Sequence, residues 1–312
     1  MLVLVKLNLV DSIRIVEVGP RDGLQNESIA VETHQKLEFI RSLWTAGLKE
    51  IEATSFVSPK FVPQLADAED LWQSLPVGPL YSALVPNEKG LSRGLEVGAG
   101  RIALFTAASE SFTQHNIRMS IRESLERFKN IAQEFRAAKP SGWIRGYVST
   151  IFQCPYEGQI SPAAVFEVVT RLIEIGVDEI SLGDTIGVGS PHEVRNLAKE
   201  LESIANEGVM IAWHFHDTWG TGLANVQAAL DLGYRSFDSS AGGLGGCPYA
   251  PGAGGNLATE DLVYLAQRQG FSTGVDLPKL ALASLPLLKT LNRVPTSKAQ
   301  QAVLAELESF QR

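Results

Sequence analysis

Two histidines, His214 and His216, occupy alternate positions at the end of a mostly apolar run over residues 210–216. Alternate side chains of a β-strand point to the same face, so the two imidazoles would lie together while Phe215 points to the other face. If the shared face is the inner face of a barrel, two imidazoles at a strand end suit a divalent metal ion. A single histidine is more often structural, so the repeated spacing favours the metal interpretation.

An acidic and an amide side chain complete a candidate ligand set. Asp22 stands beside Arg21 after the first predicted strand, and Asn256 ends a glycine-rich stretch. With the two histidines they give mixed nitrogen and oxygen ligands, which suit Mg²⁺ or Mn²⁺ better than a thiolate zinc site. An Arg–Asp pair in a turn is also typical of a surface ion pair. Its place after the first strand instead favours Arg21 as a group that stabilises a developing oxyanion.

Glu52 lies in the second predicted strand, where a carboxylate would be costly to bury alone. Pairing with Arg21 would remove that cost and would hold the guanidinium in position. We therefore predict an ion pair between Glu52 and Arg21.

The segment 242–256 contains seven glycines among fifteen residues and a single cysteine, Cys247. Composition alone favours a flexible linker. Its place directly after the last predicted strand favours a lid over the site, hinged by glycine and carrying a reactive thiol.

Eight short runs with strand character recur along the chain, each followed by a stretch of helical periodicity such as 33–47, 120–138 or 161–176. Regular alternation predicts a parallel sheet, and the count of eight predicts a closed (β/α)8 TIM barrel. An open doubly wound sheet is the alternative, but no glycine-rich dinucleotide motif follows the first strand. The predicted strands are 13–18, 50–55, 81–85, 101–106, 144–150, 179–184, 210–216 and 234–240.

The predicted barrel spans about residues 13–272 of a single catalytic domain, 1–312. A helical extension follows at about 275–312. Its apolar stretch 277–294 predicts one further helix, which would pack on the barrel wall or form a subunit contact. Catalytic groups of such barrels lie at the C-terminal ends of the strands, where all of the residues discussed above are expected.

Composition excludes several classes of protein. The net charge of −8 over 312 residues argues against a general nucleic-acid binder. Two cysteines are too few for a disulfide scaffold. The first twelve residues lack the pattern of a signal or transit peptide, and no apolar run approaches the length of a membrane helix. We expect a cytoplasmic enzyme with no membrane partner.

Several motifs together resemble the hydroxymethylglutaryl-CoA lyase family, which belongs to a wider group of metal-dependent barrel lyases and synthases. The resemblance covers about residues 13–295, and the combination of GPRDGLQNE with GGLGGCPYA is highly specific. The matching segments are VEVGPRDGLQNE (16–27), IEATSFVSPK (51–60), GYVST…CPYEG (146–158), EISLGDTIGVG (179–189), HFHDTWGTGLANV (214–226) and GGLGGCPYAPGAGGNLATEDLVY (242–264).

The resemblance implies cleavage of 3-hydroxy-3-methylglutaryl-CoA into acetyl-CoA and acetoacetate, as in leucine breakdown and ketone-body formation. It implies a Mg²⁺ or Mn²⁺ cofactor, an acyl-CoA substrate and a homodimer. Arg21 would stabilise the thioester enolate, Glu52 would support Arg21, and Cys247 would act from the lid. The general base would be Asp22 or His214. The implied metal ligands are Asp22, His214, His216 and Asn256, and the expected substrate contacts are Arg21, Gln25, Asp184 and Thr185.

Three alternatives remain. A lyase for a related 3-hydroxyacyl-CoA, such as citramalyl-CoA, would share all of these residues. Synthases that condense acetyl-CoA with a 2-oxo acid resemble the chain in two motifs but usually carry a long C-terminal region. A catalytically silent metal-binding barrel is disfavoured because six candidate residues of the site occur together.

Overall fold

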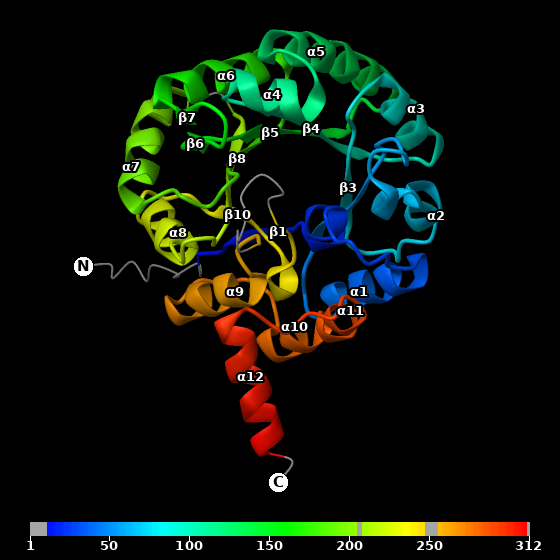
Figure 1. Cartoon of the computed structure of the whole chain (residues 1–312), viewed down its shortest axis with the longest axis vertical. Helices are drawn as coiled ribbons and strands as arrows, with labels where there is room; N and C mark the ends of the chain where they lie inside the picture. The colour runs from blue at the N-terminus through cyan, green and yellow to red at the C-terminus, as the bar shows by residue number, and fades with distance from the viewer. Residues whose placement is uncertain (1–10, 205–207, 247–254, 311–312) are drawn as a thin grey trace, which may run out of the picture.

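The computed structural model describes residues 11–204, 208–246 and 255–310. Within them, eight parallel strands close into a barrel, because β1 pairs with β10 on one side and with β2 on the other (Figure 1). The predicted (β/α)8 barrel is therefore confirmed. The barrel strands are β1 (Arg14–Glu17), β2 (Glu50–Ser55), β3 (Leu80–Leu84), β4 (Arg101–Ala107), β5 (Trp143–Ser149), β8 (Glu179–Asp184), β9 (Met210–Phe215) and β10 (Ser236–Ser239).

Helices surround the barrel and bury their apolar sides against it (Figure 1). In α6, Ser161 accepts a hydrogen bond from the Ala164 N–H at the start of the helix, and Gly176 ends it with a positive φ of 88°. Both ends follow from the capping preferences of these residue types. The surrounding helices are α1 (Thr33–Thr45), α2 (Ala68–Gln73), α3 (Glu88–Glu96), α4 (Glu110–Ile117), α5 (Ile121–Ala138), α6 (Pro162–Ile175), α7 (Pro191–Glu200), α8 (Gly222–Asp231) and α9 (Thr259–Arg268).

The C-terminal extension differs in detail from the prediction of one helix over 277–294. It forms α10 (Leu277–Ala283) and α11 (Leu285–Thr290), separated at Ser284. Pro286 explains the break, because proline has no N–H to continue the hydrogen bonding of the first helix. A third helix, α12 (Lys298–Ser309), packs against α9 and α10 and then projects away from the barrel (Figure 1).

A short antiparallel hairpin was not predicted. Its strands β6 (Gln153–Cys154) and β7 (Gly158–Gln159) are two residues long, too short to show any periodicity. No helix in the described part of the chain combines the length and apolar character needed to span a membrane.

The barrel interior contains ion pairs where many such barrels have branched aliphatic side chains. Arg14 on β1 pairs with Glu179 on β8, although β10 and β9 separate these strands in the sheet. Arg145 on β5 likewise pairs with Asp238 on β10, across two intervening strands. These contacts cross the interior. Each of these charges is therefore neutralised by a partner three strands away in the ring, as burial requires.

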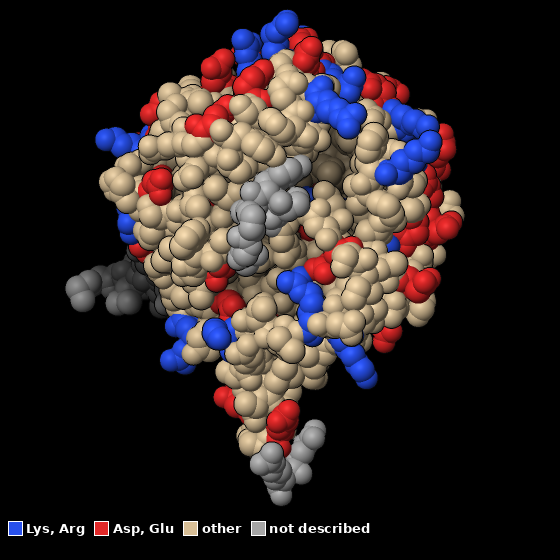
Figure 2. Space-filling view, viewed as in Figure 1, with Lys and Arg blue, Asp and Glu red and all other residues tan. Residues whose placement is uncertain are grey.

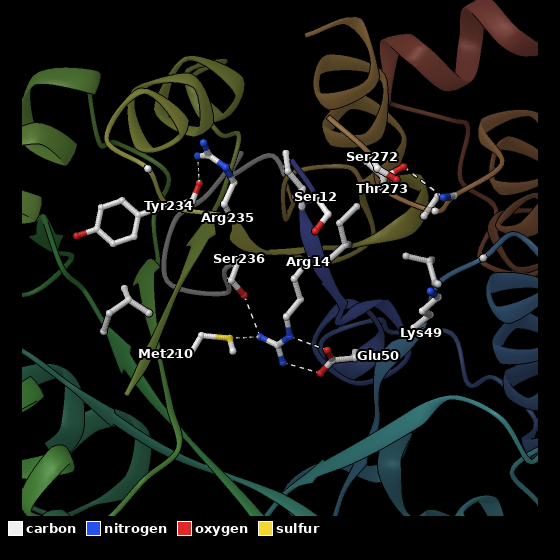
Figure 3. Close-up of a pocket in the computed structure, with 18 of the residues that line it drawn as sticks. Ser12, Arg14, Lys49, Glu50, Met210, Tyr234, Arg235, Ser236, Ser272 and Thr273 are labelled. Carbon is white, nitrogen blue, oxygen red and sulfur yellow. Dashed lines mark hydrogen bonds and ion pairs between the residues drawn. The ribbon is translucent and has the colours of Figure 1, made fainter. Parts of the chain in front are cut away.

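A pocket of about 620 Å³ lies at the N-terminal ends of the strands (Figure 3). Arg14 reaches into it and donates to Glu50 Oε1 at 2.6 Å and to Ser236 Oγ at 2.9 Å. In barrels of this type the N-terminal end contributes to stability, whereas catalytic groups stand at the opposite end. The candidate site is therefore built from the C-terminal ends of the strands and not from this pocket.

Candidate active site

Arg21 and Asp22 lie on a single wide helical turn, η1 (Gly19–Gly23), directly after β1. The N–H groups of Asp22 and Gly23 both donate to the Val18 carbonyl oxygen, at 2.8 and 3.2 Å. The turn is tight against its neighbours, since a Cβ on Gly23 would lie 2.9 Å from Ser240 Oγ. Such π-helical turns are frequent at functional sites because they redirect side chains.

Arg21 is held by two carboxylates. Its Nε donates to Glu52 Oε2 and its Nη1 donates to Asp22 Oδ1, each at 2.6 Å. Glu52 is fully buried and the Arg21 side chain is 7% exposed. The predicted pair between Arg21 and Glu52 is confirmed. The two carboxylates keep the pKa of Arg21 above its ordinary value, although burial acts in the opposite direction.

Asp22, His214 and His216 converge on one point. Each offers a ligand atom, and these atoms lie within 4.8 Å of one another. His214 Nε2 is 3.2 Å from His216 Nε2 and 3.9 Å from Asp22 Oδ2. On the other face of β9, Phe215 stacks on Trp213 with ring centroids 5.5 Å apart. The alternation expected from the H-x-H spacing is thus present.

Asn256 stands next to this triad. Its Nδ2 donates to Asp22 Oδ2 at 2.9 Å and to the Leu244 carbonyl oxygen at 3.1 Å, and its Oδ1 is buried with no hydrogen-bond partner among the described residues. Gly245 allows this close packing: its φ is +119°, and a Cβ there would lie 2.5 Å from Asn256 Nδ2. An unpartnered amide oxygen beside a carboxylate and two imidazoles fits an oxygen-preferring divalent cation.

The protonation states of two members of the triad, Asp22 and His216, suit the same ligand. Burial raises the pKa of Asp22, but the charges of Arg21, His214 and His216 outweigh it and lower the value to about 2. Burial and the neighbouring His214 lower the pKa of His216 to about 4. At neutral pH, the site therefore offers an ionised carboxylate and a neutral imidazole, the forms that bind metal ions.

Four further polar residues connect the Arg21–Glu52 pair with His214, and the prediction from sequence missed them. Tyr147 on β5 donates to Glu52 Oε2 at 3.1 Å, and the guanidinium groups of Arg21 and Arg145 lie over its ring, 5.3 and 5.0 Å from the ring centroid. Arg145 donates to Asp238, which also contacts His214. Ser181 on β8 donates to the same Asp238 carboxylate at 2.7 Å.

A signal for these residues was present in the strands. Arg145 and Tyr147 occupy alternate positions of a mostly apolar strand, and Asp238 occupies a central position of β10. Polar and charged residues in a strand enclosed by helices must find partners inside the barrel. What the pattern leaves open is which partner each one reaches.

Comparison with known proteins decides the family. The family model described as HMGL-like matches residues 12–285. The mitochondrial hydroxymethylglutaryl-CoA lyase of Bos taurus is 51% identical over 93% of this chain and 89% of that protein. The hydroxymethylglutaryl-CoA lyase of Pseudomonas mevalonii is 46% identical over 94% of this chain and 97% of that protein. The crystal structure of the Pseudomonas aeruginosa hydroxymethylglutaryl-CoA lyase covers 96% of this chain and 100% of that chain, with a TM-score of 0.91 and 44% identity.

The chain belongs to the hydroxymethylglutaryl-CoA lyase family. Membership makes it a carbon–carbon lyase with a (β/α)8 barrel, in agreement with the fold and with the cluster of Arg21, Asp22, His214 and His216 at one end of it.

Asp184 and Thr185, expected to contact substrate in a lyase of this family, mainly hold loops in place. The two Asp184 oxygens accept from the Val188 and Gly189 N–H groups, and burial raises the Asp184 pKa to about 6. Thr185 Oγ1 accepts from the Thr150 N–H at 2.8 Å, which joins the ends of β8 and β5. Gln25 follows η1 and is partly exposed.

Two buried carboxylates anchor the start of the glycine-rich segment. Glu17 accepts from Ala241 N and Thr259 Oγ1, so this strand-end residue faces α9 and not the barrel interior. Glu260 accepts from the Gly242 N–H with both oxygens. Burial raises the pKa of Glu17 to about 7 and that of Glu260 to about 8. Both carboxylates fix the turn η4 (Ala241–Gly243), from which the segment begins.

Within the predicted lid, 242–256, Cys247 and residues 248–254 lie outside the described residues. At the near end of the segment, Asn26 Nδ2 donates to the Gly246 carbonyl oxygen at 3.1 Å, which links it to the chain after η1. On the face shown in Figure 2, acidic and basic side chains of this lyase both gather mainly around the outline, and the surface is hollowed near its centre.

Proposed function

We propose that the protein cleaves 3-hydroxy-3-methylglutaryl-CoA to acetyl-CoA and acetoacetate with the help of Mg²⁺ or Mn²⁺. One observation carries this proposal: Asp22 lies between Arg21 and His214, with Oδ1 2.6 Å from Arg21 Nη1 and Oδ2 3.9 Å from His214 Nε2. A metal-binding group and an oxyanion-stabilising group are therefore adjacent, as a 3-hydroxyacyl thioester requires.

The reaction is a retro-Claisen cleavage. The C3 hydroxyl loses its proton, the C2–C3 bond breaks, and the electron pair moves onto the thioester oxygen. Arg21 stabilises the enolate that forms, with Glu52 holding its guanidinium. Asp22, His214, His216 and Asn256 would hold the cation. When bound, such a cation supplies a Lewis acid that favours ionisation of the hydroxyl.

Asp22 is the proposed base for the hydroxyl proton, and His214 is the alternative. Asp22 stays ionised at neutral pH and is partly exposed, with 25% of its side chain accessible. Asp238 raises the pKa of His214 above its ordinary value against the effect of burial, which makes this imidazole the stronger base. The pH dependence of kcat/KM distinguishes the two, because an Asp22 base predicts no rate loss between pH 5 and 7 from its own titration.

Cys247 is the proposed donor of the proton that C2 of the enolate takes up. The position of Gly246, held by Asn26, is consistent with a segment that starts at the site. Gln25 and Thr185 are proposed substrate contacts. Asp184 is proposed to act on substrate through the loop that it organises.

The experiment is a coupled assay of the purified protein with 3-hydroxy-3-methylglutaryl-CoA and Mg²⁺ or Mn²⁺, with detection of acetoacetate. Metal-dependent product supports the proposal, and binding of the thioester without cleavage contradicts it. Comparison of the two cations at matched concentrations identifies the preferred one. A parallel assay with citramalyl-CoA tests the alternative substrate, for which a higher kcat/KM would overturn the assignment.

A homodimer is also proposed. Helix α12 projects from the barrel and exposes the apolar Phe310 near its end, at 87% accessibility. A second copy of the chain could cover this surface. Sedimentation equilibrium measures the mass directly, and a monomer at micromolar concentration would contradict the proposal. The cytoplasmic location, the role in leucine breakdown and the single-domain organisation stay predictions.

A further inference from the structure

The two ring nitrogens of His214 have separate neighbours. Nδ1 lies 3.1 Å from Oδ2 of Asp238, a buried carboxylate on the adjacent strand β10. Nε2 instead lies near His216 Nε2 and Asp22 Oδ2, at 3.2 and 3.9 Å. One side of the imidazole therefore faces a single acceptor, and the other side faces the proposed metal ligands.

The contacts of Asp238 determine the direction of its bond to His214. Arg145 donates to Oδ1 and Ser181 donates to Oδ2. An ionised carboxylate has no proton to donate, so Nδ1 of His214 must be the donor. A neutral imidazole with its proton on Nδ1 carries its lone pair on Nε2.

We propose that Asp238 is a positioning residue that fixes His214 in the Nδ1–H tautomer and thereby directs the Nε2 lone pair toward Asp22 and His216. The inference rests on the proposed metal site. Histidines that bind metal ions commonly donate their second N–H to a carboxylate, which orients the ring and increases its basicity. Arg145 acts through Asp238, because its guanidinium holds this carboxylate from three strands away in the ring.

The metal-free wild-type protein provides the first test. Long-range ¹H–¹⁵N spectra recorded at alkaline pH, where both histidine rings are neutral, distinguish the two tautomers, and a His214→Gln variant assigns the signals. The expected result is an Nδ1–H pattern for His214. His216 is an internal comparison, because its buried Nδ1 has no partner within the described residues. An Nε2–H pattern for His214 would overturn the inference, and this test needs neither a metal ion nor a variant at Asp238.

The second test measures Mn²⁺ binding by electron paramagnetic resonance. In Asp238→Asn the amide oxygen can still accept from Arg145, so its NH₂ group faces His214 Nδ1 and forces the proton to Nε2. We expect the Kd for Mn²⁺ to rise about 10- to 100-fold, the loss typical of a disrupted partner of a ligand histidine. A Kd within about threefold of wild type in a folded variant overturns the inference.

Asp178→Asn is the matched control. Asp178 accepts from Arg136 Nη2 at 2.6 Å and precedes β8, at the end of the barrel remote from the histidines. The control removes the same charge from an arginine-paired carboxylate and should leave the Kd for Mn²⁺ within about twofold. If the wild-type protein binds no Mn²⁺, the proposed metal site is wrong, whereas the tautomer of His214 is decided separately by the spectra.

Discussion

Glu52 Oε2 accepts a hydrogen bond from Arg21 Nε at 2.6 Å, so a residue of β2 fixes the guanidinium that extends from the turn after β1. Both residues are buried, and Tyr147 donates to the same carboxylate oxygen at 3.1 Å. Arg21 is therefore held beside Asp22 by a residue of a neighbouring strand as well as by its own turn.

Arg21→Lys should lower kcat by about 10²–10³-fold, because the ammonium group cannot donate to Glu52 and Asp22 with the geometry of a guanidinium. Steady-state kinetics with 3-hydroxy-3-methylglutaryl-CoA measure the loss. Arg101→Lys is the control: Arg101 pairs with Glu50 at the opposite end of the barrel, and kcat should stay within about twofold of wild type. Equal losses in both variants would contradict a specific role for Arg21.

Glu52→Gln should lower kcat on the order of tenfold, equal to about 1.4 kcal/mol of transition-state free energy. The amide can still accept from Arg21 but no longer offers the charge that holds the guanidinium. Because Glu52 is not a member of the metal triad, Mn²⁺ affinity should not change. A lower kcat with unchanged Mn²⁺ affinity would distinguish the role of Glu52 from that of the proposed metal ligands. An unchanged kcat would show that the ion pair has no catalytic role.

Glu260→Gln should change how stability depends on pH. The folded-state pKa of Glu260 is raised to about 8 by burial, from an ordinary value of 4.5. The folded state therefore keeps a proton that the unfolded state loses, so this contribution to stability is complete below about pH 4.5 and declines as pH rises toward 8.

The variant lacks this titration. Its free energy of unfolding should fall less than that of wild type between pH 5 and 8, by on the order of 1 kcal/mol or more. Urea unfolding at several pH values measures the difference. Glu126→Gln, at an exposed position of α5, should reproduce the wild-type dependence. Parallel curves for wild type and Glu260→Gln would show that Glu260 titrates normally.

Arg14→Met should reduce stability by on the order of 2 kcal/mol, less than the ~3–5 kcal/mol of a fully buried pair, because the Arg14 side chain is 21% exposed. The loss leaves Glu179, which is 1% exposed, with one partner fewer. Thermal unfolding measures the change. The Kd for Mn²⁺ should stay at the wild-type value, since Arg14 lies at the N-terminal end of the barrel (Figure 3). A large loss of Mn²⁺ affinity at unchanged stability would contradict the assignment of Arg14 to stability and not to the metal site.

The sequence by itself was enough for the barrel and for the two histidines and the carboxylate that meet in the candidate metal site. Alternating strands and amphipathic helices leave few ways to bury their apolar faces, and eight of them close into a ring. His214 and His216 were predictable because a strand places alternate side chains on one face. Arg21 and Glu52 were predictable as partners because a charge buried in a barrel wall needs an opposite charge. The prediction of one helix over 277–294 was wrong, because α10 and α11 are separated at Ser284. Pro286 was a signal of this break in the sequence.

Only the tertiary structure decided which distant residues meet. Asp238 and Arg145 are 93 positions apart and meet across the barrel, and Glu17, at the end of the same strand that leads to Asp22, turns outward to α9. The reason is physical. Local sequence determines the period of an element and hence which side chains share a face. The pairing across the interior depends on how the strands are staggered when the sheet closes, and no local pattern encodes that stagger.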